Sequence, residues 1–142
     1  MDEKKVQDWM HRGVITCTTE TPVADIAATL DAHDISALVV VDENGNALGV
    51  ISRTDLVNAR FIAPYMKHWR GLSAQHLMTR PVISVSAETS IEDAAQLLFE
   101  KHIHRLVVVE KSEHHLHPVG ILSVTDLARH VGEHDQSEDD RG

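Results

Sequence analysis

The chain contains two copies of one sequence unit, and this repeat constrains the fold more than any other feature. Positions 6–41 align with positions 74–109 at an offset of 68, with 15 identical residues in 36. Positions 49–56 align with positions 120–127 at an offset of 71, with 5 identities in 8, because the second copy carries three extra residues between the two blocks. The repeat predicts two copies of one supersecondary unit.

Each copy contains an amphipathic helix. In the first copy, Val23, Ile26 and Leu30 recur at the spacing that places side chains on one helical face. Thr21 is a suitable N-cap, and Pro22 suits the first helical turn. The second copy repeats this pattern behind Thr89 with the apolar residues Ile91, Ala94, Ala95 and Leu98.

A β-hairpin and a second helix follow in each copy. Leu38–Val41 and Leu48–Ile51 are short apolar runs on either side of the turn residues 43–46. Ser52 and Asp55 then mark the start of another helix. Each copy therefore predicts the order β-α-β-β-α, and one copy alone would leave much apolar strand surface exposed.

We expect an α/β (α+β) fold in which two pseudo-symmetric repeats pack sheet to sheet. The predicted divisions are repeat 1 over 1–60, a linker over 61–73, repeat 2 over 74–131 and an acidic flexible tail over 132–142. Residues 133–142 hold five acids and one base, which accounts for −4 of the net charge of −9, and contain no apolar side chain.

Composition excludes several classes of protein. The 42% hydrophobic and 25% charged residues are typical of a soluble globular protein. The net charge of −9 argues against nucleic-acid binding, which depends on Lys and Arg. No apolar run is long enough for a membrane span, and the N-terminus lacks a signal peptide. A single cysteine, Cys17, indicates a reducing, cytoplasmic location and is expected to be a small buried apolar residue.

Four segments carry a resemblance to a known family. They are Ile35–Asp42 (ISALVVVD), Gly49–Leu56 (GVISRTDL), Ile103–Glu110 (IHRLVVVE) and Gly120–Leu127 (GILSVTDL). In this order and spacing each copy resembles a CBS domain, and the pair resembles a Bateman module over about residues 4–131. The resemblance implies a stand-alone CBS pair, because no catalytic, transport or DNA-binding segment accompanies it.

The family resemblance also implies a function. It predicts a non-enzymatic regulatory sensor that binds AMP, ADP or ATP in two clefts between the repeats and signals to a separate partner protein. One alternative is a dimerising scaffold whose clefts are empty or vestigial, and another is a binder of S-adenosylmethionine or NAD. The sequence shows no Gly-rich phosphate loop or nucleophile elbow.

The Ser-x-x-Asp segments have two interpretations. Ser52 with Asp55, and Ser123 with Asp126, have the spacing of a capping box, in which the two side chains bond the first free backbone N–H groups of a helix. A carboxylate at this place can also accept hydrogen bonds from both hydroxyls of a ribose. The family resemblance favours the second role, with Asp55 and Asp126 on ribose and the neighbouring Ser and Thr hydroxyls on ribose or phosphate.

The predicted ligand residues fall into two clefts. The resemblance assigns Val50, Ser52, Thr54, Asp55, Thr79, Pro81, Ile83, Ile103, His104 and Arg105 to one, called cleft B. It assigns Gly13, Ile15, Ile35, Ser36, Ala37, Ile121, Ser123, Thr125 and Asp126 to the other, called cleft A. The apolar members would sandwich adenine or simply pack in the core, and backbone groups near Gly13–Ile15 and Pro81–Ile83 would contact the purine edge.

The segment His104-Arg105 breaks the symmetry of the repeat, because Ser36-Ala37 stands at its place in the first copy. It is a solvated strand entry or a salt bridge, or else a phosphate site, since arginine offers a bidentate fork and histidine a second donor. A His-Arg-Leu step here resembles nucleotide-binding repeats of the AMP-activated protein kinase γ subunit. We expect His104 and Arg105 to serve the Asp55 cleft, and their removal to leave the Asp126 cleft nearly untouched.

Two other groups of residues complete the predictions. Phe61, Tyr65 and Trp69 are spaced for one helical face, although Pro64 would interrupt the helix. They suit either packing over the pair or at a subunit contact, or a wall of a ligand pocket. The second helices, expected over Thr54–Arg60 and Thr125–Val131, are further candidates for the dimer contact. His114, His115 and His117 are expected in a surface loop, without a metal.

Overall fold

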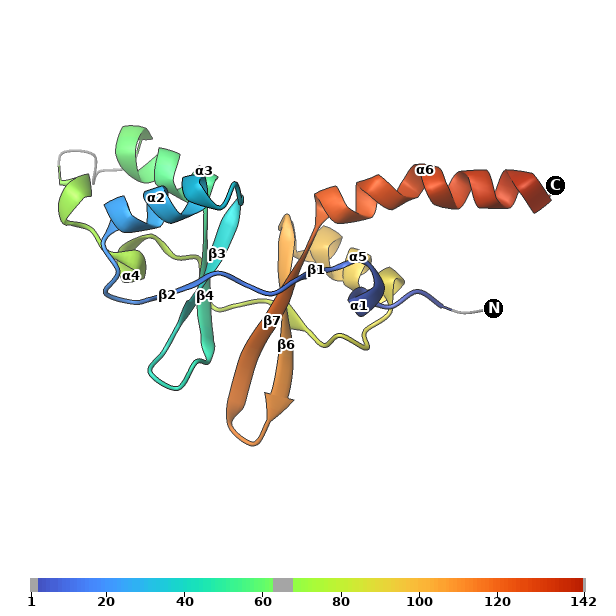
Figure 1. Ribbon diagram of the computed structural model, residues 1–142, viewed down its shortest axis with the longest axis horizontal. Coiled ribbons are helices and arrows are strands. Elements are labelled where there is room, and N and C mark those ends of the chain that lie inside the picture. Colours follow the sequence, from blue (N-terminus) through green and yellow to red (C-terminus); the bar gives the residue numbers. More distant parts are fainter. Residues whose placement is uncertain (1–2, 63–67, 142) are drawn as a thin grey trace.

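The computed structural model describes residues 3–62 and 68–141 and contains both predicted β-α-β-β-α units (Figure 1). The first unit comprises β2 (Thr16–Thr18), α2 (Val23–Ala32), β3 (Ala37–Val41), β4 (Ala47–Ser52) and α3 (Arg53–Val57), which continues as a π-helical turn, η1 (Asn58–Ile62). The second comprises β5 (Ser84–Val85), α5 (Ile91–Lys101), β6 (Arg105–Ser112), β7 (His115–Ser123) and α6 (Val124–Arg141). Before them come α1 (Val6–Trp9) with β1 (His11–Arg12), and η2 (Trp69–Gly71) with α4 (Ala74–Leu77).

The two units have the same strand pairing. β3 pairs with β4 as an antiparallel hairpin and with β2 in parallel, and β6 pairs likewise with β7 and β5. Each hairpin has its register shift at the same repeat position, between Val40 and Val41 and between Val108 and Val109. The predicted hairpins and the mixed α/β class are therefore confirmed.

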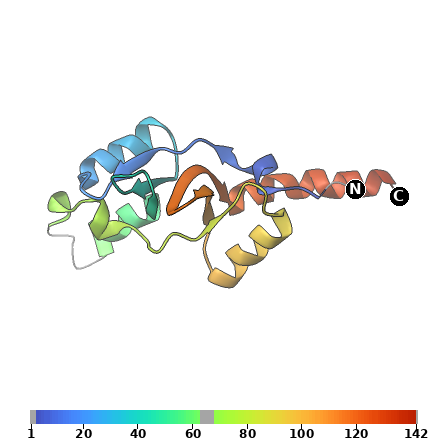
Figure 2. The same cartoon turned by 90° about the horizontal axis from the view of Figure 1, so that it is seen from below.

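The two sheets pack against each other through alternate strand residues. Val39 from β3 and Val107 and Val109 from β6 form one buried apolar cluster between the sheets. The neighbouring residues Leu38 and Leu106 point the other way, into cores covered by helices. Figure 2, which looks from below, shows the two hairpins at the centre with helices outside them.

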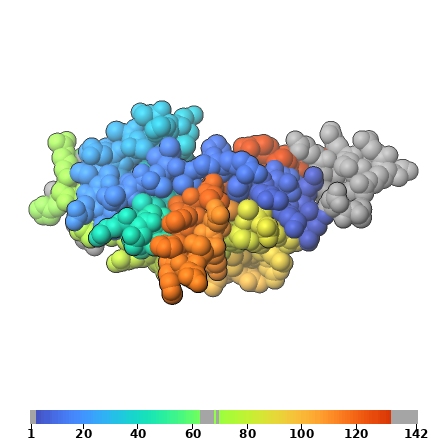
Figure 3. All heavy atoms as spheres, turned by 60° about the horizontal axis from the view of Figure 1, so that its bottom comes forward, coloured from blue at the N-terminus to red at the C-terminus, as the bar shows by residue number. Residues whose placement is uncertain are grey.

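The hairpin tips also touch. The backbone N–H of Leu116 donates to Asn46 Oδ1 at 2.8 Å, and His117 Nε2 lies 3.2 Å from the carbonyl oxygen of Asn44. In Figure 3 the two hairpins lie side by side at the surface. Asp42 accepts hydrogen bonds from backbone N–H groups of Asn44 and Asn46, which hold the pKa of its carboxyl group below its usual range.

Each repeat is completed by a segment that precedes the other repeat. Val6 of α1 is fully buried in the core of the second repeat, beside Leu98 and Leu106, and β1 pairs with β7. Ala74 of α4 is likewise buried in the core of the first repeat. In Figure 1 the N-terminal segment crosses from α1, beside α5, to β2. The chain thus exchanges two equivalent segments between its halves.

Two glycines permit this exchange. A Cβ atom at position 120 would lie 2.7 Å from the carbonyl oxygen of His11, and one at position 49 would lie 2.9 Å from that of Thr79. These distances are far below ordinary van der Waals contact, so the crossing segments can reach β7 and β4 only where no side chain intervenes. His11 and Thr79 occupy the same repeat position, as do Gly120 and Gly49.

The structure corrects several expectations about helix ends. Thr21 is not the N-cap of α2, because Pro22 holds that position and Thr21 Oγ1 instead accepts from the Thr18 backbone N–H at 3.0 Å. Ser90, not Thr89, caps α5. α6 runs as far as Arg141 and so includes most of the acidic segment for which a flexible tail is predicted.

The prediction for the surface histidines also changes. His115 and His117 lie in β7, paired with Ser112 and Glu110, so only His114 occupies the turn and the inserted residues lengthen the hairpin. Tyr65 lies outside the described residues. Residues 63–67, between η1 and η2, lie outside them too, so the Phe61/Tyr65/Trp69 helical face stays a prediction.

Candidate ligand-binding clefts

The ten residues predicted for cleft B line one cavity of about 300 Å³. Val50, Ser52, Thr54 and Asp55 come from β4 and α3, and the others come from the segments around β5 and the start of β6. The cavity therefore lies where the two repeats meet. Val82 and His102 also line it.

The residues predicted for cleft A line two cavities that share His11, Ile35, Ala37 and Ile121. The larger, of about 620 Å³, holds Ser36, Ser123, Thr125 and Asp126. The smaller, of about 310 Å³, holds Gly13 and Ile15. Both volumes lie in the range of small-molecule sites.

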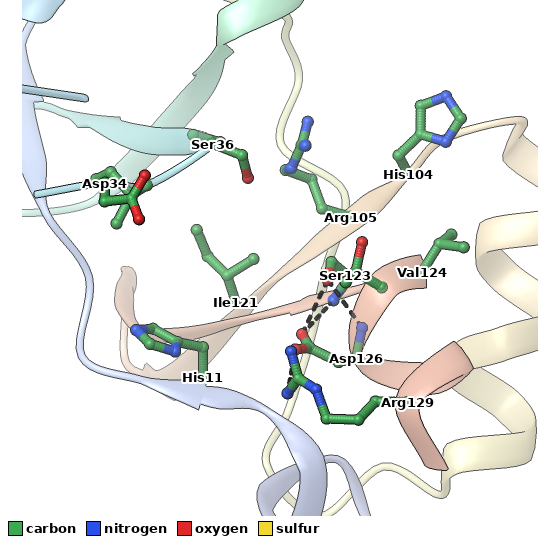
Figure 4. A pocket seen from close by; sticks show the side chains of 13 residues that line it. His11, Asp34, Ser36, His104, Arg105, Ile121, Ser123, Val124, Asp126 and Arg129 are labelled. Carbon is green, nitrogen blue, oxygen red and sulfur yellow. Dashed lines mark hydrogen bonds and ion pairs between the residues drawn. The ribbon is translucent and has the colours of Figure 1, made fainter. Parts of the chain in front are cut away.

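Asp55 and Asp126 have the same local geometry. Asp126 Oδ2 accepts hydrogen bonds from Ser123 N at 2.8 Å and from Ser123 Oγ at 3.0 Å, and Ser123 Oγ accepts from Asp126 N (Figure 4). Asp55 and Ser52 repeat these three bonds at the start of α3. The capping-box interpretation is therefore confirmed at both places.

The capping bonds use only one oxygen of each carboxylate. Among the described residues, nothing is hydrogen-bonded to Asp55 Oδ1, and the only charged group within 4.0 Å of Asp126 Oδ1 is Arg129 Nη1, at 3.6 Å. Asp126 is 8% exposed and lines the larger cavity. Each carboxylate is thus fixed by its cap while its second oxygen can accept further hydrogen bonds.

Arg105 lines one cavity more than we expected. It lines the Asp55 cavity, as predicted, but it and His104 also line the large cavity of cleft A. Burial lowers the pKa of its guanidinium, and the negative charge of Asp55 raises it. The expectation that changes at Arg105 would leave cleft A untouched rested on clefts without a shared residue, and the two cavities share Arg105.

Sequence reasoning missed several cavity residues. Arg129 follows Asp126 by one helical turn, whereas Asn58 holds the equivalent place in repeat 1, so the repeat alone does not reveal it. His11 enters cleft A through the exchanged strand β1. Asp34 and His102 share one repeat position just after a helix, have φ of 49° and 55°, and line different clefts.

The backbone near the predicted purine contacts is partly engaged. Gly13 N donates to the carbonyl of Val119 at 3.0 Å, and the carbonyls of Ile15 and Ile83 accept from Val39 N and Val107 N. Gly13 has a φ of 78°, a conformation that glycine adopts readily. The Gly13 N–H is therefore already used, and the carbonyl oxygens of Ile15 and Ile83 each have one further lone pair for a ligand.

Other reactive residues lie apart from the clefts. Cys17 packs at the core of the first repeat, and burial raises the pKa of its thiol to about 11, so the thiolate is scarce at neutral pH. Over residues 3–62 and 68–141, no three His, Cys, Asp or Glu side chains are grouped for metal binding. None of the helices found there is long and apolar enough to cross a bilayer.

A family model for the CBS domain matches residues 6–61 and 74–133, which are the two repeats together with their exchanged segments. The chain belongs to the CBS-domain family. It is a CBS domain pair, and each of its matched segments contains one of the two cleft capping boxes, Ser52 with Asp55 or Ser123 with Asp126.

Curated relatives of this CBS pair differ in length. Hypoxic response protein 1 of Mycobacterium tuberculosis is 31% identical over 129 residues, which cover 90% of this chain and 85% of that protein. An uncharacterized protein of Methanopyrus kandleri is 28% identical over 127 residues, covering 89% of this chain and 62% of the relative. Inosine-5′-monophosphate dehydrogenase of Halobacterium salinarum is 27% identical over 120 residues, covering 84% of this chain but 23% of the enzyme. The chain thus spans less than two thirds of several relatives.

Solved structures of CBS pairs share the fold closely. The CBS domain pair of protein MJ0100, in complex with 5′-methylthioadenosine and S-adenosyl-L-methionine, superposes with a TM-score of 0.81 at 25% identity, covering 93% of this chain and 98% of that one. CBSX2 in complex with AMP, a protein of Arabidopsis thaliana, gives a TM-score of 0.74 at 29% identity, covering 92% of this chain and 98% of that one. Both neighbours hold adenosine-type ligands.

Proposed function

We propose that this CBS pair is a non-catalytic sensor that binds an adenine nucleotide of the AMP, ADP or ATP type in clefts A and B. Occupancy of the clefts would change its affinity for a separate, regulated protein. The observation that carries this proposal is the pair of carboxylates, Asp55 and Asp126, each fixed through one oxygen and lining a cavity with the other available. A ribose diol is the part of a nucleotide that such an oxygen suits.

The apolar and cationic residues of the clefts support the same ligand class. Ile83 and Ile103 in cleft B, and Ile35 and Ile121 in cleft A, offer aliphatic surfaces suited to the flat faces of a purine. Arg105 and His104 bring donors for phosphate to both clefts, and Arg129 adds a second guanidinium to cleft A. This combination favours a phosphorylated nucleoside over a purely apolar ligand.

Thermal unfolding with added ligands tests the proposal. A ligand present at 100 times its dissociation constant stabilises the folded state by about 2.7 kcal/mol. We expect AMP, ADP or ATP to raise the melting temperature accordingly, and ATP to be recovered intact after hours with the protein. S-adenosylmethionine and NAD serve as the competing ligands.

The other outcomes each favour a specific alternative. A shift with S-adenosylmethionine or NAD but none with nucleotides would replace the proposed ligand class. Flat curves with all five compounds would overturn the sensor proposal in favour of a dimerising scaffold with vestigial clefts. ATP hydrolysis that disappears in an Asp55→Ala or Asp126→Ala variant would contradict a non-catalytic role.

We further propose that the protein forms a homodimer through the face that carries α3, η1 and α6. Val57, Phe61 and Ile62 are 50%, 66% and 74% exposed, and Val131 of α6 is 57% exposed. Figure 1 shows α3 and α6 along the same side of the molecule. Apolar residues gathered on one face are typical of a protein contact, and a second copy of the chain supplies a matching apolar face.

Sedimentation velocity at micromolar concentration tests the dimer. We expect a species of about twice the 15.8 kDa chain mass, and expect Phe61→Ser to convert it to monomer. Phe99→Ser is the matched control, because Phe99 is 81% exposed on a different helix, α5. A wild-type protein that sediments as a monomer would contradict the proposed dimer.

A further inference from the structure

Arg105 lies between two cavities. It lines both the cavity of Asp55 and the large cavity of Asp126. In Figure 4 its guanidinium extends away from Ser123 and Asp126, and the charge that acts on it most directly is that of Asp55 in the other cleft. The side chain thus reaches both clefts, and in this structure it is directed away from the helix start of cleft A.

The guanidinium of Arg105 is half-buried, and its bonding partners are the next question for a role in ligand binding. Among the described residues, no hydrogen bond or ion pair within 4.0 Å holds it, whereas Arg53 and Arg129 each have such a partner. A half-buried cation without a bonded partner is stabilised by an incoming anion. A phosphate in either cleft would therefore compete for it.

The repeat supplies only one such residue for the two clefts. Arg105 pairs with Ser123 across β6 and β7, and the equivalent pair in the first repeat is Ala37 with Ser52. Alanine at position 37 has no charge to offer. The protein therefore has a capped carboxylate in each cleft, Asp55 and Asp126, but at the repeat position of Arg105 it has only one guanidinium for the two clefts.

We propose that the two clefts are negatively coupled for phosphorylated ligands. The phosphate that binds first occupies the guanidinium of Arg105, so the phosphate of the second ligand binds without it. This inference rests on the proposed nucleotide binding and adds its regulation. Ligands without phosphate, such as adenosine, do not compete for the guanidinium and bind the clefts independently. Coupling of this kind requires no change of fold, only a different orientation of one side chain.

Calorimetric titration of AMP into single-cleft and intact proteins tests the coupling. The Asp126→Ala variant keeps only cleft B with its carboxylate, and the Asp55→Ala variant keeps only cleft A with its carboxylate. In each of these backgrounds, adding Arg105→Ala is expected to lower the affinity for AMP by roughly 10- to 150-fold, which is the effect of losing one charge-assisted hydrogen bond. In the otherwise wild-type protein, the product of the two AMP association constants is expected to fall by one such factor only.

Arg129→Ala is the matched control, because Arg129 lines only the large cavity of cleft A. Arg129→Ala is expected to lower the affinity for AMP in cleft A and to leave the affinity for AMP in cleft B unchanged. Adenosine affinity is expected to stay constant in Arg105→Ala.

The remaining outcomes contradict the inference in distinguishable ways. If Arg105→Ala lowers the affinity for AMP in only one of the two single-cleft variants, Arg105 contacts phosphate in that cleft alone. If the product of the constants falls by both factors, the two phosphates use Arg105 together and the coupling is absent. If wild-type protein binds neither AMP nor adenosine, the proposed function itself fails, and the coupling fails with it.

Discussion

Replacing Asp126 by alanine is expected to weaken adenosine and AMP alike in cleft A, by roughly 10- to 150-fold for each ribose hydrogen bond lost. The ribose is common to both ligands, and a bond to a charged acceptor is stronger than a neutral one. Asp55→Ala is expected to have the same effect in cleft B. Two-site calorimetric titration with adenosine measures both, since each variant should remove one of the two binding events.

Loss of a helix cap must be separated from loss of a ligand contact. Asp126→Ala also removes the bonds from Ser123 to Oδ2, and a missing cap costs about 0.5–2 kcal/mol of stability. Ser90→Ala is the control, because Ser90 caps α5 by accepting from Asp93 N at 3.1 Å and lines none of the three cavities. Comparable loss of adenosine binding in Ser90→Ala and Asp126→Ala would mean that the carboxylate acts only as a cap.

Gly120→Ala is expected to destabilise the whole protein. The new Cβ atom would lie 2.7 Å from the carbonyl oxygen of His11 and 3.0 Å from Met10 Sδ, so β1 must move away from β7. Overpacking of this kind costs typically ~1–3 kcal/mol. Urea unfolding measures the loss, which should appear as a lower midpoint.

The control for this substitution is Gly71→Ala. A Cβ atom at position 71 would meet no atom within 4 Å, and Gly71 does not have a positive φ. We expect its unfolding midpoint to stay near that of the wild type, and expect Gly49→Ala to resemble Gly120→Ala. Equal midpoints for Gly71→Ala and Gly120→Ala would show that the exchanged strand tolerates a side chain beneath it.

Much of the fold could be predicted because its elements carry strong local patterns. The apolar spacing in α2 and α5 and the valine runs of β3 and β6 are long enough to identify each element. The repeat then predicted the pairing of two equal units. The exchange between them could not be predicted, since β1 contains only His11 and Arg12, both exposed and too few to show a period.

The clefts were predictable for a related reason. Every residue proposed for cleft B lines one cavity, because family motifs sit at the same repeat positions in both copies. The missed residues are those at which the copies differ, such as Arg129 opposite Asn58, or those brought in by tertiary structure, such as His11. That Arg105 lines both cavities also needed coordinates, because repeat symmetry assigns a residue to one cleft and does not show where its side chain extends.

The reciprocal placement of α1 and α4 has a consequence for how the chain can be divided. A cut between residues 62 and 68 would give two fragments, each with its own hairpin but without the short helix that covers its core, since Val6 and Ala74 would lie on the wrong piece. Neither fragment is then a complete folding unit, although the sequence repeat suggests two. The halves should unfold in one cooperative step, and a truncation intended to isolate one repeat would need to carry the other's leading segment with it.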